Sequence, residues 1–194
     1  MNTQTGVEDR NKGRLKLVLV ALVFLGPLVL SFTLYYLGDW RPQGSTQNGE
    51  LLPPVPLSDA PLLAAGEGPR LRGKWTMIYA DEGSCAEACQ KTLYETRQIR
   101  RSLGKEMSRV QRVFVVTTGA PDAEFLASEH PMLVVAATDT TARQDLLNAI
   151  GKFQPGDIFL VDPIGNLMMR FPQGTEMKAI KEDLVHLLKV SRIG

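Results

Sequence analysis

The sequence lacks an excess of charge of either sign. Its 194 residues carry 22 lysines and arginines against 21 aspartates and glutamates, which leaves a formal net charge of +1. No basic stripe and no internal repeat interrupts that balance. We therefore expect no nucleic acid and no strongly charged substrate among its partners, because the protein as a whole would attract neither.

Histidine and cysteine are also scarce, with two of each in the chain. His130 stands before a proline at the end of a predicted short helix, and His186 lies off the apolar face of the last predicted helix. Both histidines are therefore predicted to lie on the surface rather than to bind a metal. Cys85 and Cys89 lie close together and are the one oddity of the composition.

One long hydrophobic run is present, over residues 17–37. These 21 residues contain no charge and would form a helix about 30 Å long, enough to cross the hydrocarbon layer of a membrane. Tyr35, Tyr36 and Trp40 gather at its distal end, where aromatic side chains favour the membrane interface. A buried helix of a soluble core and a cleaved signal peptide are the alternatives. The run is longer than the apolar stretch of a signal peptide and ends in Tyr-Leu-Gly-Asp-Trp, so we predict a transmembrane anchor.

Positive charge is concentrated before this run. Arg10, Lys12, Arg14 and Lys16 precede it, whereas Arg41 alone follows it closely. The positive-inside rule then predicts a cytoplasmic N-terminus and a C-terminal part on the far side of the membrane. In a bacterium this is a single-pass protein of the inner (cytoplasmic) membrane with a periplasmic domain, in a compartment where cysteine pairs can be oxidised.

Hydrophobic patterning divides the chain into four segments. They are a cytoplasmic tail over residues 1–16, a transmembrane helix over 17–37, a linker with an N-terminal extension over 38–56, and a folded domain over 57–194. Within the domain we predict strands over residues 75–80, 112–118, 132–138, 157–161 and 167–171, and helices over 87–103, 122–129, 141–150 and 175–189. Alternation of this kind predicts an α/β fold of the thioredoxin-like class, with a mostly parallel sheet and an antiparallel edge from the late hairpin.

The chemistry of the domain centres on the two cysteines. Ser84 followed by Glu87 is a capping-box pattern, which predicts Ser84 as the N-cap of a helix and Cys85 as its first residue. A spacing of four places Cys85 and Cys89 on one helix face. A helix N-terminus stabilises a thiolate and leaves the first sulfur partly exposed, as thiol–disulfide exchange requires.

Two interpretations of the cysteine pair remain open. In the first, Cys85 is the attacking catalytic thiol and Cys89 is the resolving one. In the second, the cysteines form a static disulfide, as they commonly do in exported domains. Asp81, Glu82 and Glu87 oppose the first interpretation because nearby carboxylates disfavour a thiolate. The position of the cysteine pair, at the end of the first central strand, favours the catalytic interpretation.

Four short segments carry a family resemblance. They are residues 73–76 (GKWT), the Cys85-x-x-x-Cys89 loop, residues 159–165 (FLVDPIG) and residues 171–175 (FPQGT). The sequence resembles, over about residues 48–190, the Sco/SenC family of membrane-anchored proteins that assist cytochrome c oxidase assembly. The resemblance implies a thioredoxin-like fold, an exported location, and a role in delivering copper to the oxidase or reducing its copper-site thiols. It also implies a subunit of the oxidase, or one of its assembly factors, as partner.

Two departures from the family pattern bear on function. Gln90 follows the second cysteine, where the family has proline, and Gln154 stands about where the family has its copper-ligand histidine. A glutamine amide is a poor ligand for soft Cu(I), so we expect the three-ligand copper site to be absent. Met168 and Met169 offer no good replacement, since one is predicted in the core and one on the surface. Pro155 is a candidate for the cis-proline that thioredoxin-like folds set opposite their cysteines.

Three hypotheses follow. The protein is a thiol–disulfide oxidoreductase for oxidase maturation, which needs no cofactor. Alternatively it is a non-catalytic assembly or scaffold protein with a structural disulfide. In the third, it is a copper chaperone that binds Cu(I) through Cys85 and Cys89 with some further ligand.

Overall fold

A computed structural model describes residues 5–36, 47–63, 68–136 and 140–193 of the chain. Its contacts divide the chain into two compact units, Met1–Ser45 and Thr46–Gly194. Trp40 and Arg41, on which the sequence argument about the membrane interface and orientation partly rests, lie outside the described residues.

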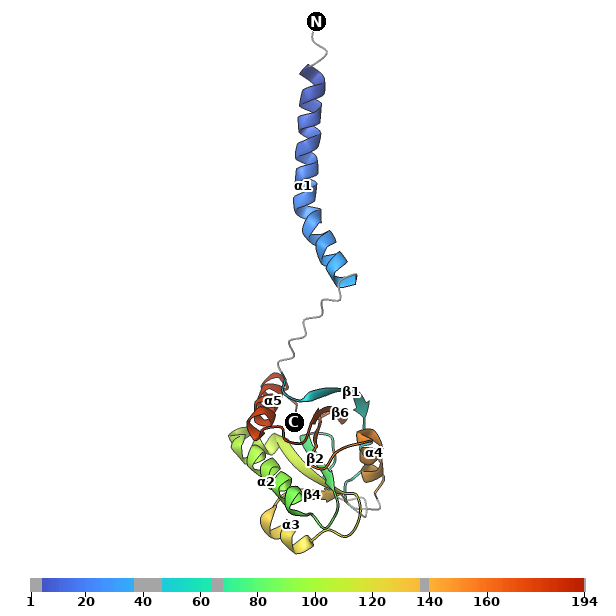
Figure 1. Ribbon diagram of the computed structural model, residues 1–194, viewed down its shortest axis with the longest axis vertical. Coiled ribbons are helices and arrows are strands. Elements are labelled where there is room, and N and C mark those ends of the chain that lie inside the picture. Colours follow the sequence, from blue (N-terminus) through green and yellow to red (C-terminus); the bar gives the residue numbers. More distant parts are fainter. Residues whose placement is uncertain (1–4, 37–46, 64–67, 137–139, 194) are drawn as a thin grey trace. The chain divides into compact units, whose positions relative to one another are not determined.

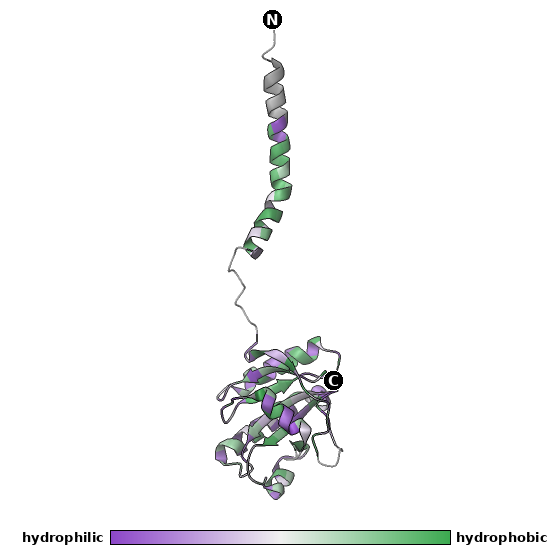
Figure 2. Cartoon of the chain, turned by 90° about the vertical axis from the view of Figure 1, so that its right-hand side faces the viewer, coloured by the Kyte–Doolittle hydropathy of each residue, from purple (hydrophilic) through white to green (hydrophobic). Residues whose placement is uncertain are grey.

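The first unit contains the helix α1, Thr5–Tyr36. Its segment Arg14–Tyr36 is long and apolar enough to cross a membrane, and none of that apolar window is buried against the rest of the protein. Figure 2 shows the apolar residues as a nearly unbroken band along the helix. The helix continues through Pro27 and begins well before residue 17, so part of the predicted tail is helical too. This is a transmembrane-like helix at the N-terminus, as the sequence predicts.

The second unit is built around one six-stranded sheet with the order β1-β6-β5-β2-β3-β4. Its strands are β1 (Glu50–Pro56), β2 (Trp75–Asp81), β3 (Val110–Val116), β4 (Leu133–Ala136), β5 (Ile158–Val161) and β6 (Asn166–Phe171). The five later strands lie within a few residues of their predicted positions. Residues 137 and 138, at the predicted end of β4, lie outside the described part.

The sheet is mixed rather than mostly parallel. Strand β2 pairs in parallel with β3, and β3 in parallel with β4. The remaining pairings, β2 with β5, β5 with β6, and β6 with β1, are antiparallel. The difference from the sequence expectation arises because the late hairpin lies inside the sheet next to β2, whereas β1 covers the outer side of β6 and forms the edge.

Helices cover both faces of this sheet (Figure 1). They are α2 (Glu87–Ser102), the 3₁₀ helix η2 (Gly104–Arg109), α3 (Ala123–Glu129), α4 (Thr141–Ile150) and α5 (Met177–Val190). Residues Ile78, Val113 and Val161 face α4, where Leu146 is fully buried. The opposite face meets α2 and α5 through a cluster that includes Ile99 and Leu184. The thioredoxin-like class predicted from sequence is therefore confirmed.

Local signals explain where most of these helices begin and end. Asp122 caps α3, accepting a hydrogen bond of 3.0 Å from the backbone N–H of Phe125. Helix α2 ends at the C-cap Leu103, and Gly104 follows with a φ of +59°. Glycine adopts this left-handed conformation without strain, so the prediction of Gly104 as the residue that closes the helix is confirmed.

The start of the second unit is attached to α5 by a buried carboxylate. Asp183 accepts hydrogen bonds of 2.8 Å from the backbone N–H groups of both Asn48 and Gly49. It also accepts a bond of 3.0 Å from the side-chain amide of Asn48. These bonds place the entering chain so that β1 pairs with β6.

Candidate functional site: the disulfide between strand β2 and helix α2

The loop between β2 and α2 carries the first cysteine, but outside the helix. Helix α2 begins at Glu87 with Ala86 as its N-cap, and no side chain caps it. Cys85 has a φ of +42°, in the left-handed region, and its N–H donates a hydrogen bond of 3.1 Å to the carbonyl of Glu82. The predictions of Ser84 as N-cap and Cys85 as first helical residue are therefore wrong, because a left-handed residue cannot continue a right-handed helix.

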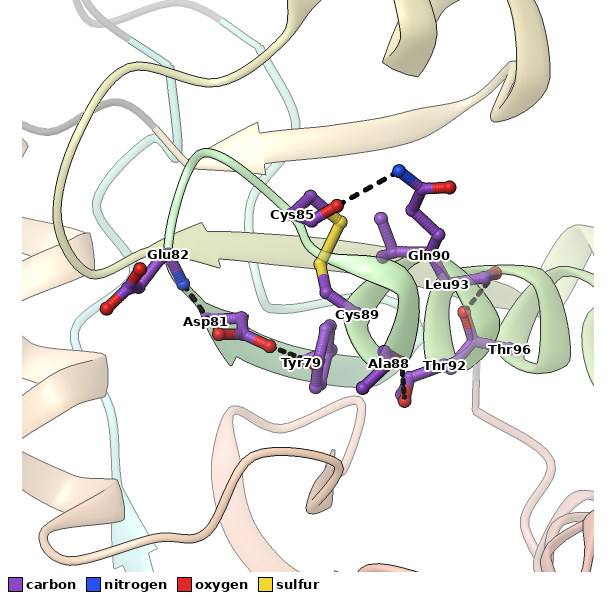
Figure 3. Close-up of a disulfide and its surroundings, with 10 residues drawn as sticks. All are labelled: Tyr79, Asp81, Glu82, Cys85, Ala88, Cys89, Gln90, Thr92, Leu93 and Thr96. Atoms are coloured by element: carbon purple, nitrogen blue, oxygen red, sulfur yellow. Dashed lines mark hydrogen bonds between the residues drawn. A yellow bond between two sulfur atoms is a disulfide. The ribbon is translucent and has the colours of Figure 1, made fainter.

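Cys85 and Cys89 form a disulfide, with their Cα atoms 5.0 Å apart (Figure 3). The bridge therefore joins the loop to the first turn of α2. Cys85 is 3% and Cys89 is 2% exposed, so the prediction of a partly exposed first sulfur is wrong. The reason is packing, because both cysteines belong to one buried cluster with Tyr79, Leu93 and Phe114.

Hydrogen bonds to main-chain carbonyls hold the cysteine loop against helix α2 and the segment that follows β3. The amide of Gln90 donates a hydrogen bond of 3.1 Å to the carbonyl of Cys85 (Figure 3). The N–H of Gly83 donates one of 2.8 Å to the carbonyl of Thr118. A Cβ at Gly83 would lie only 2.5 Å from the carbonyl oxygen of Ala120, so this approach requires glycine.

A polar network runs along β2 beside the disulfide. The Tyr79 hydroxyl donates a hydrogen bond to the Asp81 carboxylate, which also accepts one of 2.8 Å from the N–H of Glu82 (Figure 3). Burial raises the pKa of Tyr79, and the hydrogen bond and charge of Asp81 raise it further. Tyr79 is therefore a neutral donor at physiological pH. Its ring is stacked on that of Phe114, with the ring centroids 5.9 Å apart.

The loop before β5 is held by one fully buried carboxylate. Asp157 is 1% exposed and accepts hydrogen bonds from the N–H groups of Gln154 (2.8 Å) and Gln173 (2.9 Å). Its carboxylate also lies 2.8 Å from the guanidinium of Arg170. No peptide bond in the described residues is cis, so the candidate Pro155 is trans in this structure.

A cavity of about 560 Å³ lies between this loop, α2 and the start of α5. Its lining includes Ala88 and Thr92 of α2, Gly156 of the loop, and Pro172 and Thr175 before α5. Ala88 and Thr92 flank Cys89 on the helix, so the cavity lies next to the helix turn that carries the disulfide.

The described residues contain no group of three or more histidine, cysteine, aspartate or glutamate side chains that could hold a metal ion. Gln154 and His186 are exposed, and the surface prediction for His186 is confirmed. Met169 is buried and Met168 half-buried, close to the core-and-surface split that we predicted. Among the residues that the structure describes, no histidine or carboxylate forms such a group with the two cysteines, and we derive no step through copper.

His130 is the clearest error of the sequence reasoning. It is 3% exposed, not a surface residue, and its ring meets that of Phe125 edge-on at 5.3 Å. Burial lowers its pKa to about 4, and the positive charges of Arg112 and Arg97 act in the same direction. Arg112, whose charge acts on His130, is itself buried on β3, so this burial arises from packing between elements far apart in the sequence and no local pattern indicates it.

Two family models match the chain in sequence. The model described as transmembrane-like, thioredoxin-like, C-terminal domain matches residues 75–191. The model described as transmembrane-like, N-terminal domain matches residues 8–38. No curated protein matches the sequence.

Solved structures with the same fold include three Sco proteins. The apo Sco1 protein from Thermus thermophilus has a TM-score of 0.59 at 20% identity, over 75% of this chain and 99% of that one. ScoI from Arabidopsis thaliana with copper bound has a TM-score of 0.52 at 16% identity, over 62% and 87% of the two chains. Yeast Sco1 has a TM-score of 0.51 at 20% identity, over 62% and 83%. The resemblance to Sco proteins inferred from short motifs is confirmed, and at these identities it is a likeness of fold.

Proposed function

This chain belongs to the family of transmembrane-like proteins with a thioredoxin-like C-terminal domain, and we propose that it is a membrane-anchored thiol–disulfide exchange protein. One observation carries the proposal. The Cys85–Cys89 bridge lies where β2 ends and α2 begins, with Cys85 in a left-handed conformation that a residue other than glycine rarely adopts. Backbone conformations of this kind gather at functional sites, where the surrounding structure maintains them.

The proposed reaction needs the two sulfurs and no cofactor. In the reduced protein, the Cys85 thiolate attacks one sulfur of a client disulfide, and the other client sulfur leaves as a thiolate. The Cys89 thiolate then attacks the Cys85 sulfur of the mixed disulfide and releases the second client thiolate. Two electrons pass to the client and the Cys85–Cys89 bridge forms again. The same steps in reverse oxidise a client dithiol.

Local charge acts on this chemistry in both directions. The N–H groups at the start of α2 and its helix dipole stabilise a thiolate at Cys85 or Cys89. Asp81 ends β2 and Glu82 begins the loop, and their negative charges oppose formation of a thiolate. Because both cysteines are buried in the bridged state, exchange also requires the loop at residues 82–86 to move away from α2.

The location and client belong to the same proposal. We place residues 1–16 in the cytoplasm and residues 17–37 in a bacterial inner membrane. Residues 38–56 serve as linker and N-terminal extension, and the domain at 57–194 lies in the periplasm. The excess of positive charge before residue 17, within the first turns of α1, supports this orientation. A subunit of cytochrome c oxidase, or one of its assembly factors, is the proposed client, on the strength of the resemblance to Sco proteins.

A trapping experiment tests the proposal. A Cys89→Ser variant of the full chain, produced in its own membrane, retains the attacking thiol but cannot resolve a mixed disulfide. We expect a client to remain linked to Cys85 and to be released by dithiothreitol, and we expect a Cys85→Ser variant to trap nothing. Loss of oxidase assembly in the Cys85→Ser strain would identify the pathway. An absence of any trapped protein together with normal oxidase assembly would overturn the proposal.

A scaffold protein with a structural disulfide is the second candidate. The observation that favours it is the burial of both cysteines, of which Cys85 is 3% and Cys89 2% exposed. It predicts that a folded double Cys→Ser variant supports normal oxidase assembly. Binding of Cu(I) by the two thiolates is tested on the same purified protein, by asking whether the reduced chain retains copper against a competing chelator.

A further inference from the structure

A buried arginine on the central sheet lacks partners for much of its guanidinium. Arg112 lies on β3 and is 2% exposed. Its Nη2 donates a hydrogen bond of 3.1 Å to the carbonyl of Pro131, while its Nε and Nη1 are buried without a hydrogen-bond partner. Buried donors are nearly always paired in folded proteins, and a buried charge without a counter-charge is costly.

Two further arginines of α2 join it to form the arginine cluster, which we define as Arg97, Arg100 and Arg112. Arg100 is 8% exposed and donates through Nε to the carbonyl of Val110 at 2.6 Å. Burial, together with the positive charges of Arg100 and Arg97, lowers the pKa of Arg112 to about 10. Within the described residues, no carboxylate lies in ion-pair distance of Arg100 or Arg112. The cluster therefore carries more positive charge than its own surroundings balance.

His130 lies near this cluster, and the charges of Arg112 and Arg97 act on it. Its Nδ1 is buried and has no hydrogen-bond partner. The one carboxylate paired with the cluster is that of Glu129, 3.6 Å from Arg97, and its side chain is 57% exposed. The Nε of Arg97 is also buried without a partner. Four unpaired polar atoms on three side chains thus lie in one positively charged region.

A groove of about 350 Å³ opens over this region. The groove is lined by residues of α2 and of the end of α3, two of them acidic and two basic. They are Glu87, Gln90, Lys91, Tyr94, Arg97, Phe125, Glu129 and His130. Tyr94 is 49% exposed, and the guanidinium carbon of Arg97 lies 5.2 Å from the centre of its ring. The lining thus balances two carboxylates against two cations, while Arg100 and Arg112 add two positive charges behind it that no carboxylate pairs in the described residues.

We propose that this groove binds an acidic segment of a partner polypeptide. A carboxylate of the partner contacts Arg97 and His130, and Arg100 and Arg112 supply positive charge behind them. A carboxylate is the complement of this charge, and its oxygens accept from more than one donor at once. The groove is much larger than a single inorganic anion, and Tyr94 and Phe125 suit apolar side chains on either side of the acidic residue. The proposal rests on the arginine cluster and is independent of exchange at Cys85 and Cys89.

The test compares two peptides that differ in one charge. The full chain in detergent micelles is titrated with acetyl-Ala-Phe-Glu-Phe-Ala-amide, with the same peptide carrying glutamine for glutamate, and with inorganic phosphate, all at constant ionic strength. A ligand that binds only the folded protein raises its Tm as concentration increases. We expect the glutamate peptide to raise Tm by about 3 °C or more near saturation, and the glutamine peptide to leave it unchanged.

Variants test whether the rise in Tm depends on the groove. Arg97→Gln and His130→Gln are expected to remove the response to the glutamate peptide, whatever their effect on the unliganded Tm. Arg101→Gln, on an exposed position of the same helix, is the matched control and should respond as the unmodified protein does. Equal responses to both peptides, or a full response in Arg97→Gln, would overturn the proposal. A response to phosphate but not to the glutamate peptide would overturn it too, by showing a site for small anions.

Discussion

The side-chain amide of Gln90 donates a hydrogen bond of 3.1 Å to the main-chain carbonyl of Cys85. Sco proteins, which this chain resembles, have proline after the second cysteine, and proline offers no such donor. Here the backbone N–H of Gln90 also donates to the carbonyl of Ala86 at 3.0 Å. Gln90 therefore fastens the cysteine loop to α2 with its side chain while its backbone continues the helix.

Loss of this side-chain bond should make the disulfide easier to reach. We expect Gln90→Ala to be reduced by dithiothreitol about five-fold faster than the unmodified protein, since one hydrogen bond contributes about 1 kcal/mol to the closed loop. The rate is measured by trapping free thiols over time. Lys91→Ala, an exposed neighbour on the same helix, is the control. Equal rates in all three proteins would show that Gln90 does not restrain the loop.

His130 should make the domain less stable in acid. Its folded-state pKa of about 4 lies below the ordinary value of 6.5, through burial and then Arg112 and Arg97, with Glu129 opposing. As pH falls from 6.5 towards 4, the unfolded chain takes up a proton at this position and the folded protein does not. The free energy of unfolding should therefore fall by about 3 kcal/mol more in the unmodified protein than in His130→Gln.

Urea unfolding of the full chain in micelles, at several pH values, measures this difference. Well above pH 6.5 the two proteins should show parallel pH dependence, because position 130 is then uncharged in both the folded and the unfolded chain. His186→Gln, which alters an exposed histidine, should behave as the unmodified protein does. A His130→Gln variant with an unchanged acid slope would refute the neutral, buried assignment.

Replacement of Arg112 should stabilise the domain in the absence of a ligand. Arg112→Met removes a buried cation with two unpaired donors and leaves an apolar chain of similar length. Such replacements are commonly stabilising, and we expect the free energy of unfolding to rise by about 1 kcal/mol. Arg101→Met, at an exposed site, should change it little. A clear loss of stability in Arg112→Met would mean that its bond to Pro131 outweighs the cost of burial.

Asp183 should be a stronger determinant of stability than its neighbour. Asp183→Ala leaves the backbone N–H groups of Asn48 and Gly49 without their acceptor, at a cost of about 3 kcal/mol. Glu182→Ala disrupts only an exposed pair with Lys178, which contributes at most about 0.5 kcal/mol. Urea unfolding separates the two. If both variants lost the same small amount, the attachment of the entering chain to α5 would not contribute to the folded state.

Periodic features of the fold could be read from the sequence. The spacing of Ala142, Leu146 and Ile150 places one buried face on α4, and the predicted range 141–150 matches the observed Thr141–Ile150. The apolar run over residues 157–161 and the turn that follows at Asp162 likewise predicted the hairpin of β5 and β6. Local patterning could not show where that hairpin enters the sheet, because strand order depends on contacts far apart in sequence.

The site was harder to predict than the fold. The capping-box pattern of Ser84 and Glu87 was outweighed by the disulfide and by the left-handed conformation of Cys85. Burial of His130 depends on how the end of α3 packs on Arg112, which involves elements that are not adjacent in the chain. Gln90 was visible in the sequence only as a departure from a family pattern, and its role as a donor required the structure.

The reduction potential of the Cys85–Cys89 pair tests the central proposal most directly. The full chain in detergent micelles is equilibrated in graded glutathione buffers, and the fraction of free thiols is measured by mass after trapping. The account predicts a potential within the range of about −120 to −270 mV that dedicated exchange proteins span. A potential well below about −300 mV would mark a structural bridge and contradict it.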